Sequence, residues 1–286
     1  ELRARLSEIL LRPELRDALF VASPHLDQEF DVWAREPESD RGASIERALV
    51  RYFSRMAGRA TPFGLCAGCS TGKLAEETCL KVERRVTYQR HTRLGMDYLA
   101  ALLESLRSDP ALRKIFLYRP NATLYHAAGS LRLLTSRPKE KFRAFHLVTV
   151  SESEYPNATL GRAAKGATFA MLAAALVEDD VSAEEAEQYI NELIENQILV
   201  AQLPLPATGK EPATALLEEL RRHSETTAVA ETLEEGLFAL ATMDAEGLGI
   251  APARYRRVTR LFERLPVEFN LPQMFHVDMV KPAPRA

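Results

Sequence analysis

Apolar residues recur every three or four positions in several stretches of the chain, which is the spacing of helices with one buried face. In the first part of the chain, this pattern predicts helices over 2–11, 14–22, 44–58 and 96–106. Ser44 is expected to cap the third helix, because a serine side chain accepts hydrogen bonds from the first turn. Pro62 ends the helical region, since proline disfavours helix in the residue before it. An alternating stretch over 81–90 predicts a strand, so residues 1–115 are expected to form a mixed lobe.

The middle of the chain predicts strands first and helices afterwards. Two alternating stretches around Ala128 and Gly129 indicate a hairpin, and 144–151 indicates a third strand. Helices are predicted next over 157–165, 168–178 and 182–196, followed by a strand over 198–203. Three helices and a strand at this spacing are typical of a winged helix-turn-helix. Residues 116–204 are therefore predicted to form a compact unit.

The remaining residues, 205–286, predict a return to helices. These helices are expected over 212–223, 226–243 and 251–264, with a last strand over 274–280. The predicted fold class is α+β, with mixed helix and strand lobes around an embedded winged helix-turn-helix. The chain starts at Glu1 and stops just after the last predicted strand, so we expect it to be a truncated piece of a longer polypeptide.

Composition excludes several classes of protein. The 286 residues are 46% apolar and carry a net charge of −3, which is ordinary for a soluble globular protein and argues against disorder. No apolar run approaches the roughly 18 residues of a membrane-spanning helix. The chain has three cysteines, an odd number that does not indicate a disulfide framework. Cys66 and Cys69 form one Cys-x-x-Cys pair without a second pair, so no metal site is expected.

The near-neutral total conceals two charged blocks. Residues 41–93 contain eleven basic and four acidic residues, a net charge of +7. Residues 178–195 contain eight acidic residues and no basic one. The basic block could contact a polyanion such as RNA, although composition alone favours a solvated surface.

The clearest candidate chemistry lies at the end of the third predicted helix. Arg47, Arg51 and Arg55 are four residues apart and share one helix face, and Arg59 continues the series. Thr61-Pro62-Phe63-Gly64 follows directly. Guanidinium groups match phosphate oxygens, so this corner could hold an anionic ester or a terminal ribose. A solvated arginine stripe is the alternative.

This segment resembles a known family. The stretch RMAGRATPFGLCAG, residues 55–68, is similar to the signature of the lantibiotic dehydratase N-terminal region, approximately Arg-x-x-x-Arg-x-Thr-Pro-Phe-Gly-Leu-Phe-Ala-Gly. Four shorter stretches agree with the family: ELRDALFVASP at 14–24, DYL at 97–99, LPATG at 205–209 and HVD at 276–278. Two departures stand out. Cysteines occupy positions 66 and 69, and His276 stands where the family has glutamine.

The resemblance implies a tRNA-dependent enzyme. Members of the family use glutamyl-tRNA as co-substrate to esterify Ser and Thr hydroxyls of a ribosomally made precursor peptide, and a separate elimination domain then removes glutamate. No bound cofactor and no metal are implied. The catalytic residues of the family fall on Arg55, Arg59, Thr61, Asp97 and Asp278. The two arginines would neutralise a phosphate or carboxylate, and either aspartate could orient an amine or accept a proton.

Further residues are candidates for binding the two substrates. By charge alone, the tRNA backbone contacts are expected at Arg51, Arg84, Arg85 and Arg93. The resemblance assigns 1–115 and 205–286 to the glutamylation domain and 116–204 to a leader-peptide recognition element. The helix over 182–196 carries five acids and no base, which speaks against DNA binding. A leader peptide added as a strand would contact Leu147, Val148, Ile190 and Leu193, although a core position explains the last two better.

Two other functions remain open from the sequence. A peptide aminoacyl-tRNA ligase would use the same aminoacyl-tRNA but append an amino acid to a peptide C-terminus. A non-catalytic module would only bind the leader. Partners beyond precursor peptide and aminoacyl-tRNA would be a cyclase or elimination domain, or a second copy in a homodimer. We expect a bacterial cytoplasmic location, with membrane association only through a biosynthetic complex, and an isolated chain that binds leader without turnover.

Overall fold

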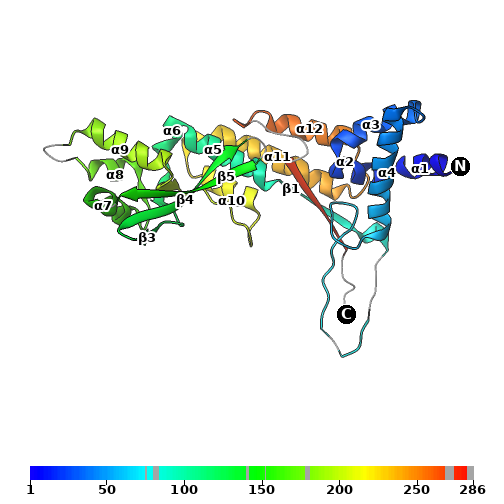
Figure 1. Ribbon diagram of the computed structural model, residues 1–286, viewed down its shortest axis with the longest axis horizontal. Coiled ribbons are helices and arrows are strands. Elements are labelled where there is room, and N and C mark those ends of the chain that lie inside the picture. Colours follow the sequence, from blue (N-terminus) through cyan, green and yellow to red (C-terminus); the bar gives the residue numbers. More distant parts are fainter. Residues whose placement is uncertain are drawn as a thin grey trace. The chain divides into compact units, whose positions relative to one another are not determined.

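The structure is a computed structural model that describes residues 1–74, 76–79, 84–139, 142–151, 153–177, 181–267 and 274–281. The chain divides into two compact units (Figure 1). The first unit comprises Glu1–Leu102, Leu205–Arg221 and Thr227–Ala286, and the second comprises Leu103–Pro204 and Arg222–Thr226. The mixture of helices and strands confirms the expected α+β class. The division into three functional regions stays a prediction.

Four helices open the first unit. They are α1 (Leu2–Leu10), α2 (Pro13–Ala22), α3 (Pro24–Arg35) and α4 (Asp40–Gly58). Helix α3 was not predicted, although Leu26, Phe30 and Trp33 have helical spacing and are buried. The prediction that Ser44 caps α4 was wrong. Helix α4 begins at Asp40, and the side chain of Ser39 accepts a hydrogen bond from the Gly42 N–H.

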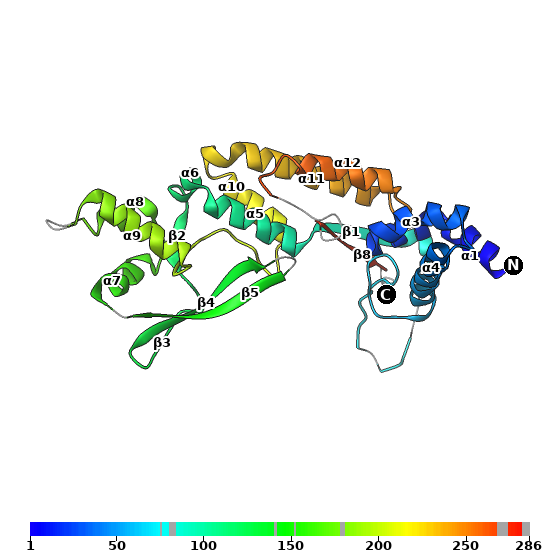
Figure 2. The same cartoon turned by 45° about the horizontal axis from the view of Figure 1, so that its top comes forward.

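A two-stranded antiparallel sheet continues the first unit. Strands β1 (Gln89–Leu94) and β8 (Phe275–Val280) pair from Gln89 opposite Val280 to Leu94 opposite Phe275. The predicted strand over 81–90 was largely wrong: Arg85–Thr87 forms a 3-10 turn, and 80–83 lie outside the described residues. The helices that accompany the sheet are α5 (Met96–Ser108), α10 (Pro212–Leu220), α11 (Thr227–Ala245) and α12 (Pro252–Phe262). Helices α11 and α12 lie side by side (Figure 2).

An ionic network around the buried Arg90 joins these elements. The Arg90 guanidinium donates hydrogen bonds to Asp17 Oδ2 at 2.9 Å, Asp244 Oδ1 at 3.1 Å, the Tyr255 hydroxyl and Thr92 Oγ1. Burial raises the pKa of Asp17. The Arg90 charge, the Tyr255 hydroxyl and the N–H groups of residues 249 and 250 act against that rise. Strand β1 is thereby fixed to α2, α11 and α12 from within the core.

The described residues of the second unit form two three-stranded sheets. One has the order β6-β2-β7, formed by Ala167–Thr168, Leu117–Pro120 and Leu199–Ala201. The other has the order β3-β4-β5, formed by Tyr125–Ala127, Ser130–Lys139 and Phe142–Ser151. The predicted hairpin around Ala128 and Gly129 is confirmed, because β3 and β4 pair on either side of these two residues. Both residues adopt the positive φ that a tight hairpin turn requires.

The helices of the second unit lie mainly after the long hairpin. They are α6 (Pro110–Arg113), α7 (Glu154–Ala163), α8 (Phe169–Ala174) and α9 (Ala183–Glu195). Helix α9 begins with a reciprocal cap between Ser182 and Glu185. The predicted order of three helices and a strand is present, whereas the winged helix-turn-helix itself stays a prediction. No helix in the described ranges is long and apolar enough to cross a membrane.

Replacing Asp17 with asparagine is expected to destabilise the first unit by about 3 kcal/mol, because the buried Arg90 charge loses its carboxylate partner. Urea unfolding can be followed by the fluorescence of Trp33, the only tryptophan of the chain, which is buried in the same unit. Glu29→Gln removes the charge that pairs with the exposed Arg41 and should cost less than about 1 kcal/mol. Equal losses in the two variants would contradict a central role for the network.

Candidate functional site

The segment after α4 folds into a tight turn. The Phe63 N–H donates to the Ala67 carbonyl at 3.1 Å, and the Cys66 N–H donates to the Phe63 carbonyl at 2.9 Å. Gly64 lies inside this turn with a φ of +51°, a conformation that glycine adopts without the strain other residues would suffer. The Thr-Pro-Phe-Gly motif is therefore a defined structure at the end of an arginine-bearing helix.

The turn is held against the edge of β8. The Cys69 N–H donates to the Met279 carbonyl at 2.8 Å, and the Lys281 N–H donates to the Cys69 carbonyl at 2.7 Å. Gly68 permits this approach, because a Cβ at its position would lie 2.6 Å from the Met279 carbonyl oxygen. Asp278, the neighbour of Met279, is thereby brought into the same part of the first unit as the arginine motif.

Arg55 is positioned by an aromatic ring. Its guanidinium carbon lies 4.1 Å from the centre of the Phe63 ring, within the range of a cation–π contact. Its Nε is buried, and no hydrogen-bond partner for that atom is found in the part of the chain that the structure describes. Arg59 and Thr61 are exposed. The site therefore offers one ordered cation beside an accessible cation and hydroxyl.

Asp278 is the centre of a second cluster, on the paired strands. Arg93 Nη2 donates to Asp278 Oδ2 at 2.5 Å, and His276 Nε2 lies 3.3 Å from Asp278 Oδ1. Arg93 stands directly opposite His276 in the register of β1 and β8. Sequence reasoning had assigned Arg93 to tRNA on charge alone and had treated His276 only as a departure from the family pattern.

The other predicted residues of the first unit are more dispersed. Asp97 is exposed in the first turn of α5, and no ion pair within the described ranges joins it to the other four candidate catalytic residues. Arg51 is exposed on α4, and Arg84 and Arg85 are exposed before β1. Their accessibility is compatible with contacts to a polyanion.

The surroundings of Cys66 disfavour a reactive thiolate. Burial raises the pKa of its thiol to about 11, against a smaller opposing effect of the Arg55 charge. The thiol is therefore protonated near neutral pH, whereas a reactive cysteine needs its thiolate. Among the residues that the structure describes, no three His, Cys, Asp or Glu side chains come together as metal ligands.

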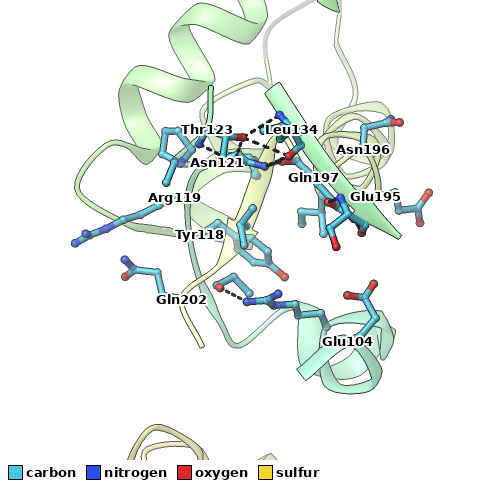
Figure 3. Close-up of a pocket in the computed structure, with 18 of the residues that line it drawn as sticks. Glu104, Tyr118, Arg119, Asn121, Thr123, Leu134, Glu195, Asn196, Gln197 and Gln202 are labelled. Carbon is cyan, nitrogen blue, oxygen red and sulfur yellow. Dashed lines mark hydrogen bonds between the residues drawn. The ribbon is translucent and has the colours of Figure 1, made fainter. Parts of the chain in front are cut away.

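The second unit has a cavity of about 940 Å³ between β2, β7, the end of α9 and the β4–β5 hairpin (Figure 3). Beside this cavity, side chains form hydrogen bonds to the backbone groups along one edge of β4. The Leu134 N–H donates to Thr123 Oγ1 at 2.9 Å, and Asn121 Nδ2 donates to the Leu134 carbonyl at 3.3 Å. The Gln197 amide accepts from the Ser136 N–H at 2.9 Å and donates to its carbonyl at 2.7 Å. No sequence motif pointed to these polar residues.

This closure shows which backbone groups of β5 face outward. Leu134 and Ser136 direct their backbone groups away from β5, so their partners Leu147 and Phe145 direct theirs away from β4. No backbone bond to that outer edge occurs in the described part of the chain. The side chains of Phe145 and Leu147 are 67% and 58% exposed.

The other predicted leader contacts are less accessible. Val148 is half-buried, and Ile190 and Leu193 are buried in the core of the second unit. Buried side chains offer almost no surface to a peptide. Ile190 and Leu193 therefore have the core positions that the sequence analysis gave as the alternative to leader contact. Phe145, which the sequence did not point to, is more exposed than any of the four predicted leader contacts.

The chain belongs to the family described as lantibiotic dehydratase, N terminus, whose model matches residues 11–286. It is 19% identical over 269 residues to the epidermin biosynthesis protein EpiB of Staphylococcus epidermidis, an alignment that covers 93% of this chain and 27% of EpiB. It is 22% identical over 209 residues to the subtilin biosynthesis protein SpaB of Bacillus subtilis, covering 71% of this chain and 20% of SpaB. The chain therefore spans about a quarter of the length of these relatives.

Two solved structures share its fold. The tRNA-dependent lantibiotic dehydratase MibB from Microbispora sp. 107891 superposes with a TM-score of 0.78 at 22% identity, covering 98% of this chain and 28% of MibB. The glutamylation domain TbtB from thiomuracin biosynthesis, bound to 5'-phosphodesmethylglutamycin, gives a TM-score of 0.56 at 19% identity, covering 96% of this chain and 33% of TbtB.

The docking of the turn depends on Gly68, so Gly68→Ala is expected to displace the segment from β8 at a cost of about 1–3 kcal/mol. Hydrogen exchange of the Cys69 and Lys281 amides, which bridge the two segments, should become faster. Gly72→Ala is the matched control, because a Cβ there would meet no atom within 4 Å. Unchanged protection of both amides in Gly68→Ala would show that the turn is held by other contacts.

Proposed function

We propose that this chain is the glutamylation part of a lantibiotic dehydratase, which transfers a glutamyl group from tRNA to Ser and Thr hydroxyls of a ribosomally made precursor peptide. The observation that carries the proposal is the arginine-bearing Thr-Pro-Phe-Gly turn docked against the strand of Asp278. Membership of the dehydratase family supports it, as does the fold shared with a tRNA-dependent dehydratase and a glutamylation domain.

The proposed reaction is an acyl transfer, which depends mainly on holding the ester and the acceptor hydroxyl in the correct relative position. The hydroxyl oxygen of the peptide forms a bond to the ester carbonyl carbon of glutamyl-tRNA, and the bond to the terminal ribose oxygen breaks. Arg55 and Arg59 would bind the phosphate or carboxylate beside that ester, and Thr61 would donate a hydrogen bond there. Asp97 and Asp278 would orient the glutamyl amine or accept a proton. The chemistry requires no metal.

The tRNA body would meet the exposed cations of the first unit. Arg51 lies on the solvent face of α4, while Arg84 and Arg85 lie just before β1. Such contacts supply affinity without sequence information and weaken as salt rises. Arg93 would serve the reaction through Asp278 rather than the tRNA backbone, because its guanidinium already donates to that carboxylate.

The second unit would bind the leader peptide. We propose that the leader adds as a strand to the outer edge of β5, where the backbone groups of Phe145 and Leu147 face outward. Their exposed side chains would contact the alternate side chains of the leader on one sheet face. This role agrees with a winged-helix recognition element that binds peptide and not DNA, since α9 presents acids and no bases.

The decisive experiment is the mass of the precursor peptide after incubation with full-length protein, tRNA and the cognate synthetase. Glutamyl adducts or dehydrated residues would support the proposal. A single addition at the peptide C-terminus would indicate a peptide aminoacyl-tRNA ligase instead. An unchanged mass with tight leader binding would indicate a non-catalytic leader-binding module.

Arg59→Ala is expected to lower the rate of glutamyl transfer about a hundredfold, because one charged donor to the tRNA end is lost. Arg59→Lys keeps the charge without the planar fork and should recover part of the rate. The adducts can be quantified by mass spectrometry at fixed tRNA concentration. Arg12→Ala removes an exposed arginine outside the proposed site and serves as the control. A rate unchanged by Arg59→Ala would contradict the assignment of the motif.

Leu147→Asp is expected to weaken leader binding at least tenfold, because a charge replaces an apolar contact beside the added strand. Fluorescence anisotropy of a labelled leader measures the affinity directly. Phe238→Asp is the control, since Phe238 is also an exposed apolar residue and lies on α11 in the first unit. If both variants bind the leader like the wild type, β5 is not the recognition edge.

A further inference from the structure

We propose that a row of four arginines on α4 and just after its end binds successive phosphates of the single-stranded 3′ end of the tRNA. The arginine row consists of Arg47, Arg51, Arg55 and Arg59. It would lead the aminoacylated ribose to the Thr-Pro-Phe-Gly turn. The inference rests on the proposed use of glutamyl-tRNA and specifies which part of that RNA the row contacts. It adds Arg47 to the residues that bind the co-substrate.

The helix sets the spacing of the arginine row. Arg47, Arg51 and Arg55 are four residues apart within α4, so they share one face and follow one another at about 6 Å along the helix axis. Arg59 comes directly after the helix, and its N–H donates to the Arg55 carbonyl at 3.1 Å. Successive phosphates of one extended RNA strand can match such a regular row. The row ends two residues before Thr61 of the motif turn.

The charges of the arginine row have no counter-charge in the described part of the chain. No ion pair or hydrogen bond joins any of the four guanidinium groups to another described residue. Neighbouring arginines differ: Arg41 pairs with Glu29 at 2.7 Å, and Arg3 pairs with Glu46 at 2.6 Å. Like charges one helical turn apart repel each other and weaken a helix. A polyanionic partner would supply the missing negative charge.

A groove of about 580 Å³ runs beside the first half of the row. Its walls include Ser44, Arg47 and Arg51, so a hydroxyl and two guanidinium groups are available to phosphate oxygens. Glu46 is the one carboxylate among the described residues that line it. Arg3 Nε and Trp33 Nε1 both donate to Glu46 Oε2, so this negative charge is already compensated. The groove therefore presents a positive surface.

Two features favour the unpaired 3′ end over the paired stem of the tRNA. Val50 lies in the groove between Arg47 and Arg51 and is 45% exposed, which offers an apolar surface to an unstacked base. The bases of a paired stem are stacked inside the helix and cannot use such a surface. The row also leads directly to the proposed reaction site, and the nucleotides next to the aminoacylated ribose are the unpaired ones.

The inferred path gives each arginine a place along the strand. The terminal ribose would lie at Arg59 and Thr61, the adjacent phosphate at Arg55, and the preceding phosphates at Arg51 and Arg47. The last two are remote from the reacting atoms and would bind the substrate and the transition state equally. Their loss should therefore raise the KM for glutamyl-tRNA and leave kcat unchanged.

The test is the affinity of the full-length protein for two deacylated tRNAs, one intact and one trimmed of its unpaired 3′ nucleotides. Fluorescence anisotropy at several salt concentrations measures it. Arg47→Gln and Arg51→Gln should each weaken binding of intact tRNA about fivefold and reduce its dependence on salt. Both variants should bind trimmed tRNA like the wild type, because the partner of the row is missing. Glutamine favours helix, so α4 should be retained.

Arg41→Gln is the matched control. It removes the same charge from the same helix, but Arg41 already pairs with Glu29, so both affinities should stay unchanged. A kinetic measurement separates binding from catalysis. In glutamyl transfer, Arg47→Gln should raise the KM for glutamyl-tRNA by the same factor as it weakens binding, with an unchanged maximal rate.

Losses confined to intact tRNA would support the inference. Equal losses with both tRNAs would overturn it and assign the row to the paired stem, and unchanged affinities in both variants would overturn it in favour of a solvated surface. Either of these results, in a wild type that transfers glutamate, leaves the proposed function intact. Losses confined to intact tRNA in a protein that transfers no glutamyl group would overturn the proposed function and leave the row as a tRNA-binding surface.

Discussion

Arg90 brings a full positive charge into the core of the first unit, where water cannot solvate it. A buried guanidinium is tolerated only when surrounding groups satisfy its donors, and here those groups come from separate elements: Asp17 on α2, Thr92 on β1, Asp244 on α11 and Tyr255 on α12. Asp17 also accepts from the N–H groups of residues 249 and 250, ahead of α12. The network allows β1 only one position against its neighbours.

That position decides which side chains of the paired strands are exposed. Side chains alternate along a strand, so turning Arg90 and Thr92 inward turns His91 and Arg93 outward. The antiparallel register then places His276 and Asp278 on the same outward face. A shift by one residue would bury these groups and expose the core, as it would for any strand with one buried face. The exposed chemistry of the site is therefore a consequence of the buried ion network.

The sequence predicted the parts of this arrangement that depend on local pattern. Helices α1, α2 and α5, the hairpin around Ala128 and Gly129, and the motif turn follow from apolar spacing, proline and glycine. Prediction from the sequence failed where the structure depends on contacts between residues far apart in the chain. The start of β1 depends on pairing with β8, nearly two hundred positions later. The pairing of Arg93 with Asp278, and the closure of the β4 edge by Gln197, join segments that no local pattern connects.

The β1–β8 sheet and the β4–β5 hairpin have opposite kinds of edge, and the difference fits the two proposed tasks. Strand β8 is paired with β1 on one edge and covered by the turn segment on the other, so its backbone is held on both sides at Met279. Such a strand can hold Asp278 within the narrow geometry that the proposed transfer requires. In the β4–β5 hairpin, Gln197, Asn121 and Thr123 bond to the backbone of β4 along one edge, while the outer edge of β5 has no backbone partner among the described residues. An unpaired edge accepts a peptide largely through its backbone, which tolerates variation in the peptide sequence.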